Sequence, residues 1–234
     1  MADTGKLAAG RAAAALVEDG MRLGLGSGST VACFLDALAD RALDVAGVPT
    51  SEATAARCRQ LGIRLLGPAD VETLDLAVDG ADELDRDLTL TKGGGGALLR
   101  EKVVAAMATR FVVVATPDKV VDRLADGFAL PVEVVPFALA PVGRTIGRLG
   151  FEVTERTAVD GTSYRTDNGN AVLDCRLPGG IADPAATAGR LGLLPGVAET
   201  GLFVGMADLA LLGDADGDVV ELTPQRPRGR AVGS

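Results

Sequence analysis

The sequence contains no histidine and no tryptophan. Without histidine the chain lacks the usual general base, the usual activator of a nucleophile and the commonest ligand of transition metals. Acid–base chemistry must therefore use carboxylates, lysines or hydroxyl groups. Cysteine is scarce as well: Cys33, Cys58 and Cys175 are widely spaced, odd in number and without a C-x-x-C pair. This pattern indicates neither a zinc site nor a disulfide framework, and it predicts buried thiols in a reducing cytosol.

Aromatic residues and positive charge are also in short supply. Aromatics make up 3% of the 234 residues, and 23 Lys+Arg stand against 32 Asp+Glu, which gives a net charge of -9. Nucleic-acid binding is disfavoured, because it needs stacking rings and an excess of cations. The longest apolar runs are too short to cross a bilayer. Segment 6–17 is predicted to be an Ala-rich helix rather than a secretion signal, since Arg11 interrupts it, and we expect a cytoplasmic protein.

The remaining composition, 47% hydrophobic and 24% charged, is typical of a packed soluble domain. Helical and strand patterns alternate over the first half of the chain. The predicted helices cover 3–19, 31–41, 52–61 and 97–108, and the predicted strands cover 22–25, 43–48, 63–66, 74–78 and 111–115. Such alternation predicts an α/β fold with a mainly parallel, Rossmann-like sheet covered by helices.

A different pattern begins near residue 130, where prolines separate short elements. Strands are predicted over 132–135, 151–154, 171–175 and 197–203, and helices over 142–149 and 184–191. A final apolar hairpin, 207–212 with 219–222, is expected to rejoin the main sheet. We therefore predict a main α/β domain formed by 1–129 plus 206–223, a smaller α+β domain formed by 130–205, and a disordered tail over 224–234.

The loop after the first predicted strand is rich in glycine and hydroxyl residues. Residues 24–30 are Gly-Leu-Gly-Ser-Gly-Ser-Thr and lead into a helix, whose first N–H groups can bind a phosphate and which Ser29 or Thr30 is expected to cap. The loop lacks the Gly-Lys-Ser/Thr of a Walker motif, and Val31 replaces the third glycine of a dinucleotide motif. A tight strand-to-helix turn explains the small residues about as well, although the two hydroxyls slightly favour phosphate.

A second motif follows the predicted strand 74–78. Asp79 lies at the carboxyl end of this strand, where ligands bind in open α/β sheets. Asp79 and Asp82, separated by Gly80 and Ala81, can point into one small cavity and raise each other's proton affinity. A solvated acidic turn is the alternative, and it suits Asp85 well. An oxygen-only Mg²⁺ or Ca²⁺ site is less favoured.

The run Lys92, Gly93, Gly94, Gly95 and Gly96 is the third motif. Four consecutive glycines lose much conformational entropy on folding, so the run should have a compensating use. Backbone packed against a ligand explains it better than a linker does, with Lys92 placed to neutralise developing negative charge.

Glu101 follows about one turn inside the next predicted helix. From the sequence alone, an ordinary surface glutamate explains this residue equally well.

These motifs resemble, in order, those of the type A ribose-5-phosphate isomerase family, which acts in the non-oxidative pentose phosphate pathway. Residues 26–30 are similar to its Gly-Thr-Gly-Ser-Thr loop, 79–83 to its DGADE motif, 92–95 to its KGGG motif and 100–102 to its REK motif. Further matches lie at 130–135, 166–170, 195–197 and 201–203. A single short motif arises easily by chance, whereas this ordered set covers most of the chain.

The resemblance implies interconversion of ribose 5-phosphate and ribulose 5-phosphate through a cis-enediolate, with Glu101 as the base. Asp79 and Asp82 would handle hydroxyl protons and ring opening, while Lys92 and loop N–H groups would stabilise the enediolate oxygen. The implied substrate-binding residues are Lys6, Ser27, Gly28, Ser29, Thr30, Asp79, Gly80, Ala81, Asp82, Lys92, Gly93, Gly94, Gly95 and Lys119. Lys6 and the 27–30 loop are expected at the phosphate end.

The resemblance also implies a homodimer or homotetramer and a ferredoxin-like lid over 130–205. No cofactor or metal is implied, since an aldose–ketose shift needs no redox partner. Ser27 stands where the family usually has threonine, a change that keeps the hydroxyl.

Two other functions stay open. A sugar-phosphate sensor without catalysis would use the same loops, but Glu101 beside Lys92 would then have no purpose. A repressor of this kind would need a DNA-binding module, and about twenty residues precede the first predicted strand. Acyl or CoA transfer through a glutamate nucleophile would leave Asp79, Asp82 and Lys92 without clear roles.

Overall fold

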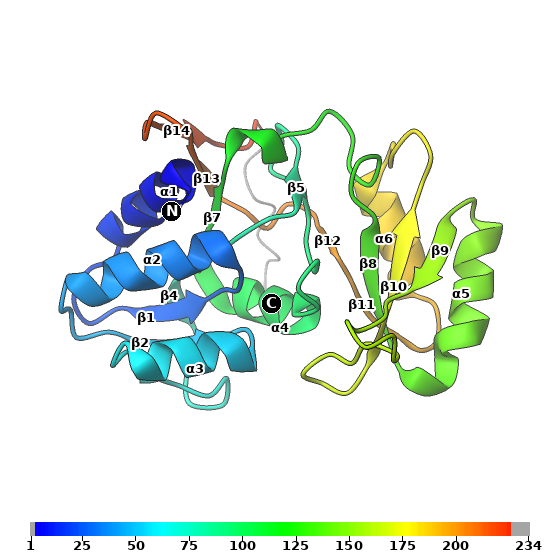
Figure 1. Ribbon diagram of the computed structural model, residues 1–234, viewed down its shortest axis with the longest axis horizontal. Coiled ribbons are helices and arrows are strands. Elements are labelled where there is room, and N and C mark those ends of the chain that lie inside the picture. The colour runs from blue at the N-terminus through cyan, green and yellow to red at the C-terminus, as the bar shows by residue number, and fades with distance from the viewer. Residues whose placement is uncertain (1–2, 226–234) are drawn as a thin grey trace, which may run out of the picture.

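The computed structural model describes residues 3–225, and its largest sheet has seven strands in the order β14-β13-β7-β4-β1-β2-β3 (Figure 1). All neighbouring strands are parallel except β13 and β14. This confirms the predicted mainly parallel sheet and the return of the C-terminal hairpin beside β7. The strands are β1 (Arg22–Leu25), β2 (Ala46–Pro49), β3 (Arg64–Leu65), β4 (Leu74–Asp79), β7 (Ala108–Ala115), β13 (Leu209–Gly213) and β14 (Val219–Leu222).

Helices cover both faces of this sheet. Phe34 and Leu38 of α2 contribute to the core on one face, and Val104 of α4 contributes to the core on the other. Successive residues of the central strand β7 enter the two cores alternately, so that β7 is one continuous apolar run. The first face carries α1 (Thr4–Ala15), α2 (Ser29–Asp40) and α3 (Glu52–Gln60), and the second carries α4 (Leu98–Met107).

A second, antiparallel sheet lies to one side of the main sheet (Figure 1), with strand order β11-β8-β10-β9. Val132, Ile146 and Leu173 lie in its own hydrophobic core. The unit falls within 130–205, and its separation as a lid domain stays a prediction. Its elements are β8 (Leu130–Val134), α5 (Leu139–Arg148), β9 (Glu152–Glu155), β10 (Ala171–Arg176), α6 (Pro184–Gly192) and β11 (Val197–Thr200).

A third sheet of very short strands was missed from the sequence. β5 (Glu83–Leu84), β6 (Leu90–Thr91) and β12 (Leu202–Phe203) pair in the order β12-β6-β5. The predicted single strand over 197–203 is therefore wrong, because the chain changes sheets at Gly201. A Cβ at Gly201 would lie 2.2 Å from the carbonyl oxygen of Lys92, so only glycine fits at this crossing.

Several helix ends differ from prediction, and α5 begins at Leu139 rather than at 142. α1 ends at Ala15 rather than 19, and α2 begins at Ser29 with Gly28 as its N-cap, so that neither Ser29 nor Thr30 caps it. Cys58 and Cys175 are buried thiols as predicted, whereas Cys33 is partly exposed. Of the predicted disordered tail, 226–234 lies outside the described residues. Within 3–225, no helix is long and apolar enough to span a membrane.

Candidate active site

The order in which strands join the main sheet reverses between β1 and β4. From β1 the chain continues to β2 and β3 on one side, and from β4 it continues to β7 and β13 on the other. Loops that leave neighbouring strands at such a point diverge, which opens a crevice at the carboxyl ends of the strands. The β1–α2 loop and Asp79, the last residue of β4, meet here, as the sequence predicted.

Asp79 is held beneath the β1–α2 loop and is 3% exposed. Its Oδ1 accepts the backbone N–H groups of Ser27 at 3.0 Å and Gly80 at 2.8 Å. A Cβ at Gly26 would lie 2.3 Å from the same oxygen, so position 26 must be glycine for Asp79 to occupy this place. These contacts leave Oδ2 of Asp79 free to face Lys92.

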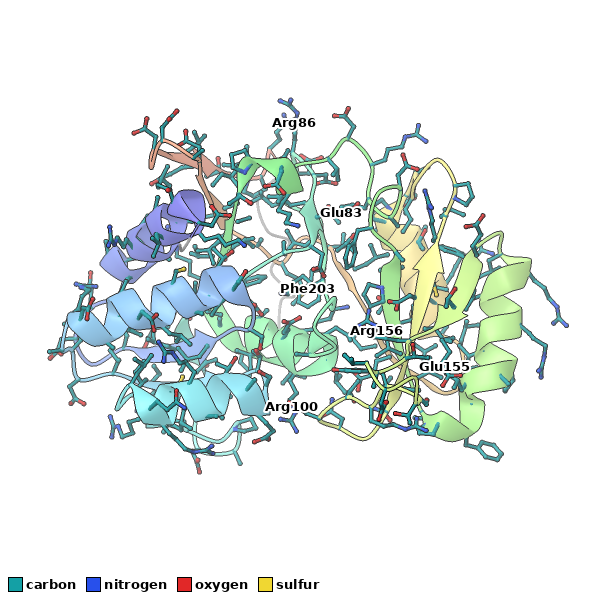
Figure 2. All side chains as sticks on the ribbon, viewed as in Figure 1. Glu83, Arg86, Arg100, Glu155, Arg156 and Phe203 are labelled. Atoms are coloured by element: carbon teal, nitrogen blue, oxygen red, sulfur yellow. The ribbon has the colours of Figure 1, made fainter. Side chains whose placement is uncertain are left out.

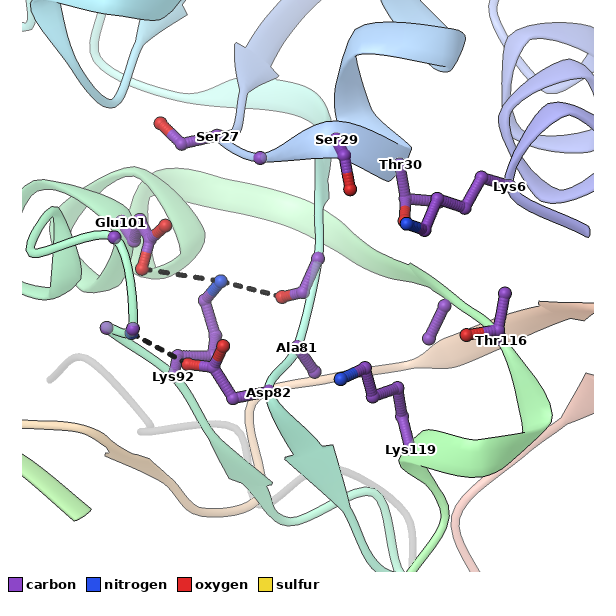
Figure 3. A pocket seen from close by; sticks show the side chains of 16 residues that line it. Lys6, Ser27, Ser29, Thr30, Ala81, Asp82, Lys92, Glu101, Thr116 and Lys119 are labelled. Atoms are coloured by element: carbon purple, nitrogen blue, oxygen red, sulfur yellow. Dashed lines mark hydrogen bonds and ion pairs between the residues drawn. The ribbon is translucent and has the colours of Figure 1, made fainter. Parts of the chain in front are cut away.

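The ammonium group of Lys92 lies at the centre of the site. Its Nζ donates to the carbonyl oxygen of Gly80 at 2.6 Å and lies 3.4 Å from Glu101 Oε2 (Figure 3). It also lies 3.2 Å from Asp79 Oδ2. The Phe203 ring of β12, with its centroid 5.5 Å from Nζ, adds a cation–π contact. One buried cation thus faces two buried carboxylates, which leaves excess negative charge when both carboxylates are ionised.

This arrangement shifts the pKa of each charged group. Burial, followed by the charge of Asp79, raises the pKa of Glu101 to about 8 against the opposing effect of Lys92. Burial also raises the pKa of Asp79. Burial by itself would lower the pKa of Lys92, but Asp79 and Glu101 outweigh it and raise that pKa. Lys92 therefore stays charged, while Glu101 can exchange a proton near neutral pH.

Glu101 lies in the first turn of α4 and is 6% exposed, so the surface-glutamate alternative is wrong. Its carboxylate lines the cavity beside Lys92 (Figure 3). Among the described residues, Glu101 Oε2 accepts no hydrogen bond. A buried carboxylate oxygen that has an ion pair at 3.4 Å but accepts no hydrogen bond is costly when charged, and it can accept a proton from a ligand.

Asp82 approaches the cavity from a different direction. Its Oδ2 accepts the backbone N–H of Gly94 at 2.8 Å (Figure 3). Asp82 lines the cavity, whereas Asp79 lies beneath it against Lys92. We expected Asp79 and Asp82 to point into one cavity and to raise each other's pKa. The structure corrects this expectation, because Asp79 instead raises the pKa of Glu101.

Contacts within the protein explain most of the glycine loop 93–96. Gly93 and Gly96 have φ values of 102° and 78°, in the left-handed region. A Cβ at Gly96 would lie 2.3 Å from Tyr164 Oη, and one at Gly94 would lie 2.7 Å from Asp82 Oδ1. Gly95 is the one position of this loop where a Cβ would meet no atom within 4 Å. The expected close approach of ligand to backbone is therefore possible at Gly95, while the fold itself requires the other three glycines.

The resulting cavity has a volume of about 220 Å³. Every residue predicted for the site lines it, except Asp79. Ala115 and Thr116 line it too and were missed. Ala115 is the last residue of the apolar strand β7 and Thr116 follows it, so the rule that pointed to Asp79, a residue at the carboxyl end of a parallel strand, would have found them.

The end of the cavity away from Glu101 is cationic. Lys6 of α1 lies beside Thr30, and Lys119 of the short 3-10 helix η1 (Pro117–Lys119) lies across the cavity (Figure 3). Among the described residues, the acidic contacts of these two lysines are solvent-exposed and 3.7–4.0 Å long. No side chain caps α2 at Gly28, so its first N–H groups are open to an anion.

Ser27 contributes backbone rather than its hydroxyl. Ser27 Oγ hydrogen-bonds to Thr50 Oγ1 and Ser51 Oγ at 2.8 Å and to Thr54 Oγ1 at 3.0 Å. This cluster of hydroxyls anchors the β1–α2 loop to α3. Within 3–225, no group of three or more Asp, Glu, Cys or His side chains is placed to hold a metal ion.

The cavity thus has a proton-exchanging carboxylate at one end and an anion-binding end opposite it. These two features define an α/β enzyme that performs acid–base chemistry on a small anionic molecule. The profile of the family described as ribose 5-phosphate isomerase A (phosphoriboisomerase A) matches residues 46–217. The chain belongs to this family, and it is an isomerase.

Relatives and solved structures agree with this assignment. Ribose-5-phosphate isomerase A of Methylorubrum extorquens is 49% identical over 222 residues, covering 91% of this chain and 93% of that protein. The enzyme of the same name from a Roseiflexus species is 51% identical, covering 88% and 90%. The structure of ribose 5-phosphate isomerase A from Methanocaldococcus jannaschii is 37% identical, with a TM-score of 0.88 and coverage of 93% and 97%.

One further solved structure carries a ligand. A D-ribose-5-phosphate isomerase in complex with phospho-erythronic acid is 34% identical to this chain, with a TM-score of 0.91 and coverage of 95% and 99%. That relative therefore binds a small phosphorylated acid.

Proposed function

We propose that the protein interconverts D-ribose 5-phosphate and D-ribulose 5-phosphate through a cis-enediolate, in the non-oxidative pentose phosphate pathway, with Glu101 as the base. Membership of the isomerase family supports the reaction, and the relative that binds phospho-erythronic acid supports a small phosphorylated substrate. The observation that carries the role of Glu101 is its buried carboxylate at the cavity wall, whose Oε2 forms an ion pair with Lys92 Nζ at 3.4 Å but accepts no hydrogen bond within the described residues.

In this mechanism Glu101 removes the C2 proton of the open-chain aldose, which leaves an enediolate, and then returns a proton to C1. The base must be ionised to start the cycle and must hold the proton long enough to return it. A pKa of about 8 suits both steps, since Lys92 favours the ionised form while burial and Asp79 oppose it. A base of this kind contributes on the order of 10²- to 10⁴-fold to the rate.

Lys92 acts mainly through its charge. A lysine has three N–H donors, and Gly80, Asp79 and Glu101 already lie within reach of its Nζ. Its positive charge in a buried site lowers the energy of the enediolate, since electrostatic interactions are strong away from water. In our proposal Asp82 exchanges the hydroxyl protons, and the loop N–H groups supply direct hydrogen bonds to the enediolate oxygen.

The cationic end of the cavity would hold the substrate phosphate. Lys6, Lys119 and the open N-terminus of α2 at Ser29 and Thr30 supply charge and N–H donors there. Binding energy from this non-reacting end can hold C1 and C2 against Glu101, which favours the transition state.

The test compares purified, EDTA-treated wild type with Glu101→Gln and with the control Glu72→Gln, which alters an exposed glutamate. We expect the wild type and the control to convert ribose 5-phosphate. Glu101→Gln should bind phospho-erythronic acid but lose on the order of 10²- to 10⁴-fold in kcat. Wild-type turnover in Glu101→Gln would remove Glu101 from the mechanism. A folded wild type that binds sugar phosphate without turnover would favour a sensor.

We also propose that the protein is a cytoplasmic homodimer or homotetramer in which 130–205 forms the lid. Large apolar side chains exposed on this unit support association: Phe137 is 97% exposed and Leu193 is 83% exposed. Light scattering across a range of protein concentrations tests it, and a monomer throughout would contradict it.

A further inference from the structure

Two side chains of the second sheet unit hold the backbone of the glycine loop 93–96. Arg156, which follows β9, donates from Nη1 to the carbonyl oxygens of Gly93 at 2.8 Å and Gly94 at 2.9 Å. Tyr164 donates its hydroxyl to the carbonyl oxygen of Gly95 at 3.1 Å. Figure 2 shows Arg156 on the side of the second sheet that faces the main sheet. Three successive loop carbonyls are thus bound by residues from another sheet.

Arg156 is itself rigidly held. Its Nε donates to Asp174 Oδ2 at 2.9 Å, and its Nη2 pairs with Asp174 Oδ1, which completes a two-pronged ion pair with β10. Its guanidinium carbon lies 5.7 Å from the centroid of the Tyr164 ring. Its side chain is 14% exposed. A planar guanidinium fixed in this way offers its remaining donors in one direction.

The direction of these contacts determines where the loop N–H groups point. The described chain has no cis peptide bond, and in a trans peptide the C=O and the following N–H point in opposite directions. Because Arg156 draws the Gly93 and Gly94 carbonyls toward itself, the N–H groups of Gly94 and Gly95 point away from it. The Gly94 N–H meets Asp82 Oδ2 at 2.8 Å, and Gly95 lines the cavity.

We propose that Arg156, supported by Asp174 and Tyr164, is a positioning residue for the glycine loop. It directs the Gly94 N–H at Asp82 and the Gly95 N–H at the reacting end of the cavity. Arg156 does not itself line the cavity, so it acts through the loop. The inference rests on the proposed isomerisation for its kinetic test.

The physical need for such a clamp follows from the loop composition. Glycines restrict their own backbone least, so four in a row sample many orientations unless other groups hold them. Arg156 and Tyr164 restrict the loop from outside. Their place on the second sheet unit also means that any movement of this unit toward or away from the main sheet moves the loop N–H groups.

The kinetic test uses Arg156→Met, Arg156→Lys and the control Arg165→Met, which alters a nearby exposed arginine. We expect Arg156→Met to lose on the order of 10²-fold in kcat, the cost of misplacing groups by about 1 Å. KM should change far less, because the phosphate end is untouched. Arg156→Lys should recover only part of kcat, since lysine keeps the positive charge but lacks the planar fork that pairs with both oxygens of Asp174 while it reaches the loop carbonyls. A folded Arg156→Met protein with wild-type kcat would overturn the proposal.

A milder variant serves if Arg156→Met fails to fold. Tyr164→Phe removes the hydrogen bond to Gly95 but keeps the ring against Gly96, so kcat should fall by about 2- to 10-fold. An unchanged kcat would overturn the proposal. Tyr164 is the only tyrosine and the chain has no tryptophan, so its fluorescence monitors the clamp directly. Arg156→Lys should alter this emission and Arg165→Met should not.

Binding separates this inference from the proposed function. If the wild type shows no turnover, the proposed function fails, and the affinity for phospho-erythronic acid then decides the inference. Weaker binding by Arg156→Met, with Arg165→Met unchanged, would support the clamp, because the carboxylate of this acid carries a charge that the sugar substrate lacks and would meet the Gly95 N–H at the reacting end. Equal affinity in all three proteins would overturn it.

Discussion

Replacing Glu101 by glutamine should remove a loss of stability that the wild type undergoes as the pH rises, in addition to its effect on turnover. The pKa of Glu101 is raised from 4.5 to about 8 in the folded protein, mainly by burial. Between these two values the folded state holds a proton that the unfolded state has released. The stability that this proton confers is therefore complete below about pH 4.5 and is lost progressively as the pH rises through 8.

The size of this loss follows from proton linkage. One proton taken up on folding costs about 1.4 kcal/mol of stability for each pH unit. From about pH 6 to about pH 8 the wild type should lose roughly 2 kcal/mol, because the linkage weakens close to the folded pKa. Glutamine does not titrate, so Glu101→Gln should lack this loss. Asp79, whose pKa is also raised, is present in both proteins, but its charge interacts with that of Glu101, so the difference between the two proteins reports the titration of this pair.

Because the chain has no histidine, no side chain of ordinary pKa titrates between about pH 6 and 8 and contributes to the measured change in stability. Urea unfolding followed by circular dichroism, at equal protein concentration and ionic strength, gives the free energy of unfolding at each pH. The control Glu72→Gln should follow the wild type. If Glu101→Gln loses as much stability as the wild type, then Glu101 is ionised in the folded protein throughout this range, and the argument from burial is wrong.

Three further predictions concern the glycine loop and the phosphate end of the cavity. Gly95→Ala should leave the melting temperature unchanged and reduce kcat/KM, because its methyl group enters open cavity space. Gly96→Ala should lower the free energy of unfolding by about 1–2 kcal/mol, because the backbone there is left-handed and the new Cβ would meet Tyr164. Thermal unfolding with steady-state kinetics checks both, and a destabilised Gly95→Ala would contradict the first. Lys119→Ala should raise KM about 10-fold with kcat nearly unchanged, since it removes a charged contact to the phosphate. The exposed control Arg86→Ala should leave KM unchanged, and an unchanged KM in Lys119→Ala would count against this contact.

Much of the fold could be predicted because its elements are long and periodic. β1 was predicted at its observed bounds, and the apolar run 111–115 predicted the C-terminal part of β7. β5, β6 and β12 were missed because two residues carry no period, and such strands exist only through pairing with one another. The break at Gly201 was missed for a related reason, since its cause is a carbonyl from Lys92, far away in the sequence.

The site divides in the same way. The chemical capacity of the chain is evident from its residues: with no histidine, the base must be a carboxylate, a lysine or a hydroxyl group, and the motif residues at 26–30 and 79–82 follow strands whose ends form one edge of the sheet. Tertiary structure alone settles which carboxylates interact. Lys92 joins Asp79 to Glu101 rather than to Asp82, because β4 and α4 place these two carboxylates within 3.4 Å of its ammonium.

Orientation, too, depends on partners that are distant along the chain. The hydroxyl of Ser27 turns from the cavity toward Thr50 and Thr54, and the glycine loop takes its direction from Arg156. A local pattern specifies residue type, spacing and periodicity. Burial, pKa and the direction of an N–H group depend on what the folded chain packs around them, and for these the three-dimensional arrangement is decisive.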